Sequence, residues 1–415
     1  MSRRRVVVTG LGCVSPVGNT VADAWANVLA GKSGIGPITK FDASSFSCRI
    51  AGEVKDFQLD AYIGTKEART MDTFIHFGVA AASQAVADAN LPTLEALTDE
   101  FATRIGCLMG SGIGGLPMIE NVHADFLQRG ARRISPYFVP ATIVNMLAGQ
   151  VAIRFGFKGP NIAIVSACTT GLHCIGEAGR MIEYGDADVM LAGGSEATVS
   201  PLGVGGFAAM RALSTRNDDP QTASRPWDRD RDGFVLGEGA GVMVLEELEH
   251  AKARGARIYA ELAGFGMSAD AGHMTAPNLD GPRRAMLAAM RNAGVNADQI
   301  DYLNAHGTST PLGDLNESNA IKAALGDHAG KLVVNSTKSM TGHLLGGAGG
   351  IESVFTVLAL YHQKSPPTIN IFNQDPECDL DYCANTARDM KIDVALKNNF
   401  GFGGTNGSLV FKRAS

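Results

Sequence analysis

The stretch Asn161-Ile-Ala-Ile-Val-Ser-Ala-Cys-Thr-Thr-Gly171 decides the fold prediction for this chain. Its apolar, β-branched run is typical of a strand, and a turn of small residues leads into a helical pattern that continues to Tyr184. Cys168 therefore lies at the start of the predicted helix, where the helix dipole and free backbone N–H groups stabilise a thiolate. On residue type alone, the competing interpretation is a buried structural cysteine.

Two histidine-containing segments also follow predicted strands. Residues 304–310 follow the apolar run 300–303, and residues 335–343 follow the run 331–334. Polar groups just past strand ends lie where open α/β sheets present ligand-binding residues. For a lone histidine the alternative is a structural hydrogen-bonding role. Zinc binding by Cys168, His306 and His343 is a weaker alternative, because none of the three is in a close ligand pair.

A glycine-rich segment and a weak internal repeat complete the pattern. Residues 398–407 follow the predicted strand 392–396, and their four glycines allow close backbone approach and movement around two phenylalanines. Short β-branched runs alternate with Ala-rich helical patterns along the whole chain, which indicates an α/β architecture. The repeat pairs residues 5–12 with 258–266, and 188–194 with 393–399.

Composition excludes several classes of protein. The 415 residues are 45% hydrophobic, enough for a large core, and the net charge of −6 argues against a general nucleic-acid binder. Seven cysteines at irregular spacing favour free thiols and a reducing cytosol over a disulfide framework. The basic start resembles a secretory signal, but early glycines predict a first strand instead, and no run approaches the ~20 apolar residues of a membrane span.

Together these segments resemble the β-ketoacyl-acyl-carrier-protein synthases, the condensing enzymes of fatty acid elongation. The resemblance covers residues 4–412 and is strongest to the bacterial long-chain type, synthase II. It implies the thiolase fold, an α/β fold with two pseudo-repeated halves in a five-layer αβαβα arrangement. The expected N-terminal half, 1–254, carries the nucleophile, and the expected C-terminal half, 255–415, carries both catalytic histidines and a gating loop. The motifs are residues 167–171, 224–233 and 399–406.

The resemblance also implies the chemistry. Cys168 would accept an acyl group from acyl carrier protein, with the backbone N–H groups of Cys168 and Phe402 forming the oxyanion hole. His306 and His343 would donate hydrogen bonds to the thioester oxygen of malonyl-acyl carrier protein while carbon dioxide leaves. The resulting enolate would attack the acyl group and release a β-ketoacyl product two carbons longer.

Further residues carry supporting roles by resemblance. Lys338 would orient the catalytic groups through an ion pair with Glu352. Phe400 and Phe402 would gate acyl entry, and the flanking glycines make that motion physically reasonable. The remaining substrate-binding predictions are Thr308 and Thr310 on the phosphopantetheine arm, and Ile113 and Phe207 on the acyl pocket, with core packing as the alternative for the last two.

Expected partners and surroundings follow from the same resemblance. The protein is expected to be a cytoplasmic homodimer that binds acyl carrier protein and needs no cofactor or metal, with no nucleic-acid or membrane partner. Surface solubility is the alternative role for each basic residue. The predicted carrier-protein docking residues are Lys66, Arg69, Arg132, Arg133 and Arg211. Departures from the family pattern are Thr70, Asn399, Gly347 and Gly350.

Three alternative functions stay open to different degrees. A degradative thiolase needs a second catalytic cysteine in a Cys-x-Gly motif, which Cys378 and Cys383 do not provide. A polyketide ketosynthase keeps the same Cys-His-His set and is the strongest alternative. A non-catalytic partner subunit usually lacks the nucleophile.

Residues 228–233 begin like an EF-hand loop but have Gly239 at the twelfth position, so a salt-bridged structural loop is the better interpretation.

Overall fold

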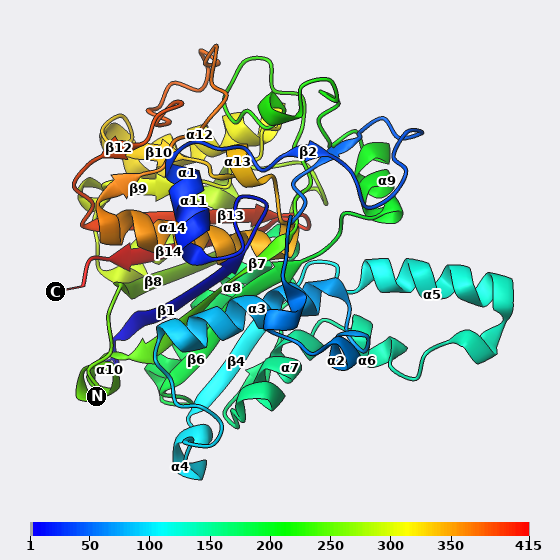
Figure 1. The fold of residues 1–415 in the computed structure, drawn as a ribbon. Helices are drawn as coiled ribbons and strands as arrows, with labels where there is room; N and C mark the ends of the chain where they lie inside the picture. The colour runs from blue at the N-terminus through cyan, green and yellow to red at the C-terminus, as the bar shows by residue number, and fades with distance from the viewer. Residues whose placement is uncertain (1–2, 415) are drawn as a thin grey trace.

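The computed structural model describes residues 3–414, so residues 1–2 and 415 of the two expected halves lie outside it. A ten-stranded sheet runs through the molecule in the order β10-β9-β13-β14-β8-β1-β7-β6-β4-β5 (Figure 1). The strands are β1 (Val6–Val14), β4 (Ile105–Gly110), β5 (Asn161–Ile162), β6 (Val189–Glu196), β7 (Gly239–Glu247), β8 (Ala260–Ala269), β9 (Tyr302–Asn304), β10 (Val333–Asn335), β13 (Val394–Gly401) and β14 (Thr405–Lys412).

The sheet consists of two five-stranded halves with the same topology. In each half, the strands counted along the chain lie in the spatial order third, second, fourth, fifth, first. The third, second and fourth strands of each half are parallel to one another. The fifth strand is antiparallel to both of its neighbours. Antiparallel pairing of β1 with β8, from Val6↔Leu262 to Val8↔Ala260, joins the halves. The pseudo-repeat predicted from the sequence is therefore present in the sheet.

Helices occupy equivalent places in the two halves. Helix α3 (Thr73–Asp88) contacts β1 and β7, as α11 (Asp280–Ala293) contacts β8 and β14. Between them, α8 (Thr170–Tyr184) and α14 (Ala348–His362) contact one another and strands of both halves. Helix α7 (Met146–Phe155) lies beside α3, and α12 (Pro311–Leu325) beside α11. This arrangement gives the predicted five layers.

Shorter elements complete the chain within the described residues. No helix there is both long and apolar enough to cross a membrane. The other helices are α1 (Val21–Leu29), α2 (Thr65–Ala68), α4 (Asp99–Ala102), α5 (Leu116–Arg129), α6 (Phe138–Thr142), α9 (Pro201–Ala209), α10 (Leu248–Ala253) and α13 (Lys338–Thr341). The 3₁₀ turns are η1 (Leu59–Ala61), η2 (Ala131–Arg133), η3 (Ala167–Thr169), η4 (Pro220–Thr222), η5 (Ala297–Gln299), η6 (Gly326–His328) and η7 (Leu345–Gly347), and the short strands are β2 (Gly36–Pro37), β3 (Ile50–Ala51), β11 (Lys364–Ser365) and β12 (Arg388–Asp389).

Glycines let the two central helices approach closely. A Cβ on Gly171 would lie 2.6 Å from the backbone nitrogen of Gly350, and one on Gly349 would overlap the backbone nitrogen of Leu172. Since real Cβ atoms do not come this close to backbone, larger residues here would push α8 and α14 apart. Both helices begin at the cavity described below, so their spacing helps to set its geometry.

Two predicted strands have different lengths in the structure. β5 ends at Ile162, because this edge strand pairs only with β4 and the chain then leaves the ladder toward the Cys168 turn. β13 continues through the first part of the glycine-rich segment to Gly401, paired with β14 from Val394↔Lys412 to Gly401↔Thr405. The predicted glycine-rich loop is therefore mostly a hairpin, with a short turn at residues 402–404.

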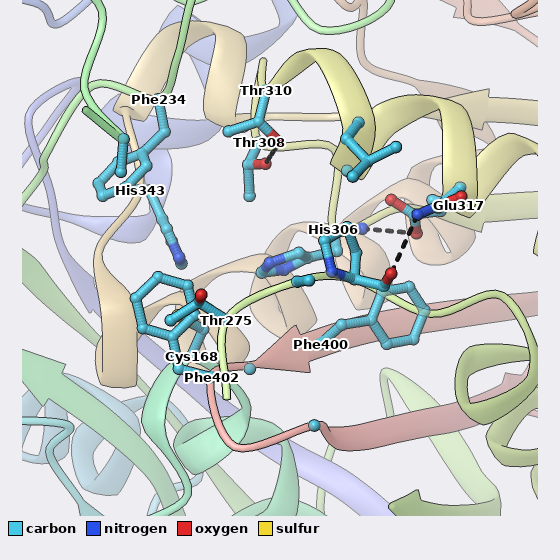
Figure 2. Close-up of a pocket in the computed structure, with 18 of the residues that line it drawn as sticks. Cys168, Phe234, Thr275, His306, Thr308, Thr310, Glu317, His343, Phe400 and Phe402 are labelled. Carbon is cyan, nitrogen blue, oxygen red and sulfur yellow. Dashed lines mark hydrogen bonds between the residues drawn. The ribbon is translucent and has the colours of Figure 1, made fainter. Parts of the chain in front are cut away.

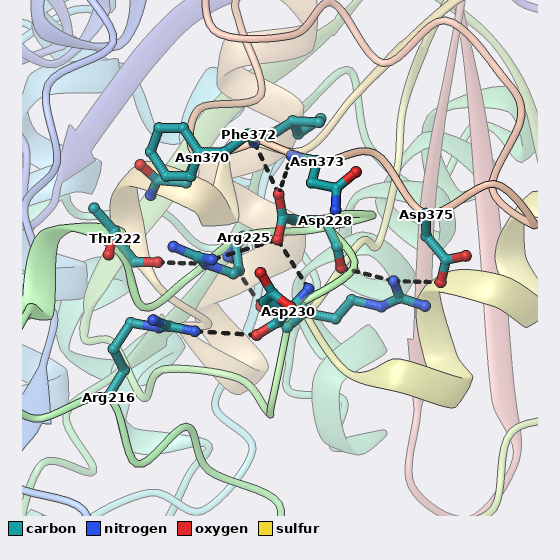
Figure 3. A network of polar contacts seen from close by, with 12 residues as sticks. Arg216, Thr222, Arg225, Asp228, Asp230, Asn370, Phe372, Asn373 and Asp375 are labelled. Carbon is teal, nitrogen blue, oxygen red and sulfur yellow. Dashed lines mark hydrogen bonds and ion pairs between the residues drawn. The ribbon is translucent and has the colours of Figure 1, made fainter.

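The salt-bridged loop predicted at residues 228–233 is present (Figure 3). The backbone N–H groups of Phe372 and Asn373 each donate to Asp228 Oδ2 at 2.8 Å. Asp228 also pairs with Arg225, and Arg231 pairs with Asp375 at 2.9 Å. These contacts fasten the N-terminal loop to the C-terminal segment 370–375, so the loop is structural rather than a calcium site.

Candidate active site

A strained turn presents the predicted nucleophile. Cys168 lies in η3, between β5 and α8, and the residue before it, Ala167, has a left-handed φ of +51°. This conformation is unfavourable for a residue with a Cβ, and such strain is kept mainly where it positions a functional group. Cys168 is 8% exposed and lines a cavity.

The cavity brings groups from both halves together. It has a volume of about 390 Å³ and is lined by Cys168, His306, His343, Phe400 and Phe402 among others. Figure 2 shows the two histidines around one space above Cys168 and Phe402. The imidazole rings lie 5.2 Å apart between centroids and nearly perpendicular, at 86°. The structure therefore brings together three segments that are far apart in the sequence. Cys168 and His343, the first and last of the three residues, are 175 residues apart.

Hydrogen bonds fix how each histidine carries its proton. The backbone N–H of Leu345 donates to His343 Nδ1 at 3.3 Å. The Asn399 amide nitrogen lies 3.3 Å from His306 Nδ1. Because both Nδ1 atoms face donors, a neutral ring in either position carries its proton on Nε2. Each histidine can then donate one hydrogen bond from Nε2.

Burial and nearby cations keep both rings neutral. Burial lowers the pKa of His306 well below its ordinary value, and Lys338, His343 and Lys397 lower it further. Burial also lowers the pKa of His343 well below its ordinary value, again with Lys338 and Lys397 contributing. Neutral imidazoles are hydrogen-bond donors without a full charge, which suits them to hold a thioester oxygen that becomes an enolate oxygen.

The resting nucleophile is a thiol rather than the stabilised thiolate expected from the sequence. Burial raises the pKa of Cys168 to about 12, although the positive charge of Lys338 and the backbone N–H of Phe402 both lower it. Desolvation therefore outweighs the favourable groups at the helix start. The Phe402 N–H nevertheless faces the Cys168 sulfur, which places it where the predicted oxyanion hole requires a donor.

The predicted ion pair of Lys338 with Glu352 lies behind the cavity. Both side chains are 1% exposed, and Lys338 Nζ contacts Glu352 Oε1. Burial would raise the pKa of Glu352, but Lys338 and Lys397 hold that pKa below its ordinary value. Neither residue lines the cavity, so they can act on it only through the histidines and their neighbours.

The predicted substrate-binding residues divide into two groups. Thr308 and Thr310 line the cavity, and their hydroxyl groups lie 3.0 Å apart just before α12. Phe207 also lines it, with ring centroids 5.3 Å from Phe234 and 6.3 Å from Phe402. Ile113 is 39% exposed and does not line this cavity, so its role in the acyl pocket stays a prediction.

Sequence reasoning missed several residues of the site. Phe234 lies 5.4 Å from the His343 ring, and the Glu317 carboxylate accepts from the backbone N–H groups of His306 and Gly307 at 2.9 and 2.7 Å. Lys397 is fully buried beside Glu352. A lysine inside the otherwise apolar run 394–397 was a signal for it, whereas nothing local distinguishes Phe234 or Glu317.

The predicted docking residues are all exposed but lie on different elements. Lys66 and Arg69 are in and just after α2, and Arg132 and Arg133 are in η2. Arg211 follows α9 and lines the cavity mouth. Their role in carrier binding stays a prediction.

No metal cluster accompanies this site. Among residues 3–414, no group of three or more His, Cys, Asp or Glu side chains is arranged to hold a metal ion. The seven cysteines are all free and buried.

Comparison with known proteins gives the family. The N-terminal domain model of the β-ketoacyl synthases matches residues 3–251, and their C-terminal domain model matches residues 259–372. The chain belongs to the β-ketoacyl synthase family. It is 59% identical to the 3-oxoacyl-[acyl-carrier-protein] synthase 2 of Vibrio harveyi over 100% of this chain and 99% of that protein. The corresponding protein of Coxiella burnetii is 56% identical, with the same coverage.

Solved structures of β-ketoacyl synthases agree with the fold. A β-ketoacyl synthase from Burkholderia phymatum matches with a TM-score of 0.92 at 36% identity, covering 99% of this chain and 100% of that one. A ketosynthase in complex with its type II polyketide acyl carrier protein matches with a TM-score of 0.91 at 37% identity, covering both chains completely. These likenesses confirm the predicted thiolase fold class.

Proposed function

We propose that this β-ketoacyl synthase condenses an acyl group held on Cys168 with malonyl-acyl carrier protein, in the manner of a synthase II of fatty acid elongation. One observation carries the proposal: Cys168 shares a cavity with two neutral histidines that each keep a proton on Nε2. That set provides a nucleophile and two donors for a second thioester. The full-length identity to synthase 2 proteins supports the same reaction.

The first half-reaction moves the acyl group onto Cys168. The sulfur attacks the thioester carbonyl of acyl-acyl carrier protein, the carrier's thiol leaves with the proton, and a new thioester forms on the enzyme. Because the resting group is a thiol, its proton passes to the carrier sulfur, and the carrier leaves as a neutral thiol. The backbone N–H groups of Cys168 and Phe402 stabilise the oxygen that becomes negative in between.

The second half-reaction makes and uses a carbon nucleophile. His306 and His343 donate from Nε2 to the thioester oxygen of malonyl-acyl carrier protein. The bond to the carboxylate breaks, carbon dioxide leaves, and its electron pair forms an enolate held by these two donors. The enolate carbon attacks the acyl carbonyl on Cys168, the cysteine sulfur leaves, and the product is a β-ketoacyl-acyl carrier protein two carbons longer.

The same proposal covers the remaining roles. Thr308 and Thr310 bind the phosphopantetheine arm, Phe207 and Phe400 contact the acyl chain, and Lys66, Arg69, Arg132, Arg133 and Arg211 attract the acidic carrier. The reaction needs no cofactor beyond the phosphopantetheine on its substrates. Seven free thiols support a cytoplasmic location, where they stay reduced. A solved relative bound to its acyl carrier protein supports the carrier as partner.

We also propose that the protein is a homodimer. The segment from α5 to α6 extends away from the body of the molecule (Figure 1), yet it exposes apolar side chains that include Leu127, Tyr137 and Val139. The strand β5, which is in contact with α7, is one of the two edges of the sheet. An exposed apolar surface and an open sheet edge are each typical of an interface. Solved relatives include ketosynthases paired with a chain length factor.

Polyketide synthesis is the second candidate. It is favoured by the structural likeness to a ketosynthase that was solved in complex with its type II polyketide acyl carrier protein and bound to the hexaketide. Identity to that protein is 37%, against 59% to a synthase 2, so fatty acid elongation is the better-supported function. Fatty acid elongation and polyketide synthesis differ in how many rounds of condensation extend the product on one carrier, and in which carrier protein the enzyme accepts.

A single-turnover experiment tests the proposal. Purified protein is mixed with acyl-acyl carrier protein, and intact-protein mass spectrometry measures acylation of Cys168; malonyl-acyl carrier protein is then added and carbon dioxide release is measured. We expect acylation, followed by carbon dioxide release and loss of the acyl group from the enzyme. Cys168→Ala is the blank for acylation, and an equal mass gain on that variant would remove Cys168 from the mechanism.

A further inference from the structure

Lys397 is a second buried lysine on the Glu352 carboxylate. It lies within β13, its side chain is 0% exposed, and its Nζ is 2.8 Å from Glu352 Oε2. Lys397 also donates to the backbone oxygen of Asn398, while Lys338 contacts the other carboxylate oxygen, Oε1. Two buried ammonium groups on one carboxylate are costly, since removal of each charge from water must be compensated by its partners. Stability alone is therefore a weak reason for this arrangement.

A chain of contacts leads from Lys397 to His306. The Asn399 amide nitrogen donates to Glu352 Oε2 at 3.0 Å, the same oxygen that Lys397 contacts. That amide nitrogen also lies 3.3 Å from His306 Nδ1. Lys397 and Asn399 are two apart on β13, so their side chains lie on the same face of the strand. Lys397 and Asn399 therefore contact the same oxygen of Glu352, Oε2.

We propose that Lys397 is a positioning residue for the decarboxylation half-reaction: its ammonium group fixes Glu352, which keeps Asn399 against His306 Nδ1 and leaves His306 Nε2–H for the malonyl thioester. This inference rests on the proposed function, because it uses the role of His306 in decarboxylation. Cys168 is not part of this chain of contacts. Loss of Lys397 therefore affects decarboxylation more than acylation.

The charges around Lys397 set the direction of the expected effects. Lys397 faces Glu352 on α14, Lys338 on α13 and Glu317 on α12. His306 precedes α12 and His343 lies between α13 and α14, and both are close enough to sense the charge of Lys397. Burial lowers the pKa of Lys397 to about 8, Glu352 opposes this and Lys338 adds to it. Since Lys397 in turn lowers the pKa of His306, removing its charge raises the His306 pKa.

The primary test compares Lys397→Met with the wild-type enzyme. Methionine keeps the length and apolar stem of the side chain but removes the charge. We expect the rate of carbon dioxide release from malonyl-acyl carrier protein to fall on the order of 10- to 100-fold, as for a slightly misplaced catalytic group, while acylation of Cys168 stays close to wild type. Lys391→Met is the control, because Lys391 is exposed and pairs with Asp393 at the surface.

A second readout does not depend on turnover. Nitrogen-15 NMR of labelled histidine follows the His306 ring, and its pKa is expected to rise in folded Lys397→Met but not in Lys391→Met. A purely structural role would lower both half-reactions equally, even though the ring pKa rises with the loss of the charge. That outcome, or unchanged decarboxylation in the folded variant, overturns the proposal. If wild-type protein neither acylates nor decarboxylates, the proposed function fails, and the ring measurement still tests the contact chain.

Wild-type protein provides the test if the variant does not fold. Lys397 is charged below its pKa of about 8 and neutral above it. The ion pair with Glu352 therefore weakens as the pH rises through about 8, and the His306 ring signals must shift with the same midpoint. The variant Lys397→Gln, which keeps a donor without the charge, is expected to show the high-pH ring signals at pH 7. Ring signals that stay constant while Lys397 loses its proton overturn the proposal.

Discussion

In the proposed reaction, His306 and His343 act as neutral donors, because burial and the nearby ammonium groups of Lys338 and Lys397 lower the pKa of both rings. A protonated imidazole would be a stronger acid, but it would also pay desolvation beside Lys338 and Lys397. Backbone and amide donors at both Nδ1 atoms leave Nε2–H free. The site is therefore organised to stabilise an oxygen that gains negative charge, rather than to transfer a proton to it.

Replacing His343 separates the two half-reactions. We expect His343→Ala to slow carbon dioxide release on the order of 10²- to 10³-fold, the usual cost of one oxyanion donor, while Cys168 is still acylated. Carbon dioxide release and intact-protein mass spectrometry measure the two steps. His362→Ala, at the exposed end of α14, is the control. Lost acylation with normal decarboxylation would contradict this division of roles.

The buried thiol gives a pH dependence in the free enzyme. Because the pKa of Cys168 is raised to about 12, the thiolate fraction grows about tenfold per pH unit throughout the range below it. Alkylation of Cys168 by iodoacetamide, followed by mass spectrometry with Cys168→Ala as the blank, should therefore rise steadily from about pH 7 to 9. A rate that levels off below about pH 8 would show a stabilised thiolate instead.

At the scale of elements, the spacing of α8 and α14 depends on glycine. Gly349→Ala places a Cβ against the Leu172 backbone and is expected to cost about 1–3 kcal/mol of unfolding free energy, more than the gain in helix propensity. Chemical denaturation measures the difference. The control Gly330→Ala adds a Cβ with nothing within 4 Å and should be close to neutral. Equal stability of the two variants would mean that α8 and α14 can separate freely.

Local sequence predicted those elements whose structure is decided locally. The Cys168 turn, α8 and the main repeated strands followed from apolar runs and small residues. The length of β5 depends instead on its single neighbour β4, and the hairpin at 394–412 depends on pairing between β13 and β14. The family resemblance supplied Lys338 and Glu352, but the contact of Lys397 with the same carboxylate depends on how β13 packs on α14, which no local pattern contains.

At the scale of the whole molecule, the site exists only between the halves. Cys168 precedes α8 in one half, whereas both histidines and the β13–β14 hairpin come from the other. The pseudo-repeat explains why they meet: α8 and α14 are equivalent central helices, and Cys168 and His343 both lie just before their starts. The predicted boundary between residues 254 and 255 falls in the short connection from α10 to β8 and stays a prediction.

The assembly of two chains is testable in solution. We expect sedimentation velocity to give twice the chain mass of 43.4 kDa, because the α5–α6 segment exposes apolar side chains. The double variant Leu127→Asp/Val139→Asp should shift the mass toward the monomer. Tyr184→Asp, which alters an exposed apolar residue at the end of α8, is the control. Wild-type protein that sediments as a monomer at micromolar concentration would contradict the dimer.

The most direct test of the account is mass spectrometry of carrier-bound products. Purified protein is mixed with malonyl-acyl carrier protein and a graded series of acyl-acyl carrier proteins, including a monounsaturated long chain. We expect β-keto products two carbons longer across medium and long chains. Acylation of Cys168 without any elongated product would contradict condensation by this site, and products extended over several rounds on one carrier would favour polyketide synthesis.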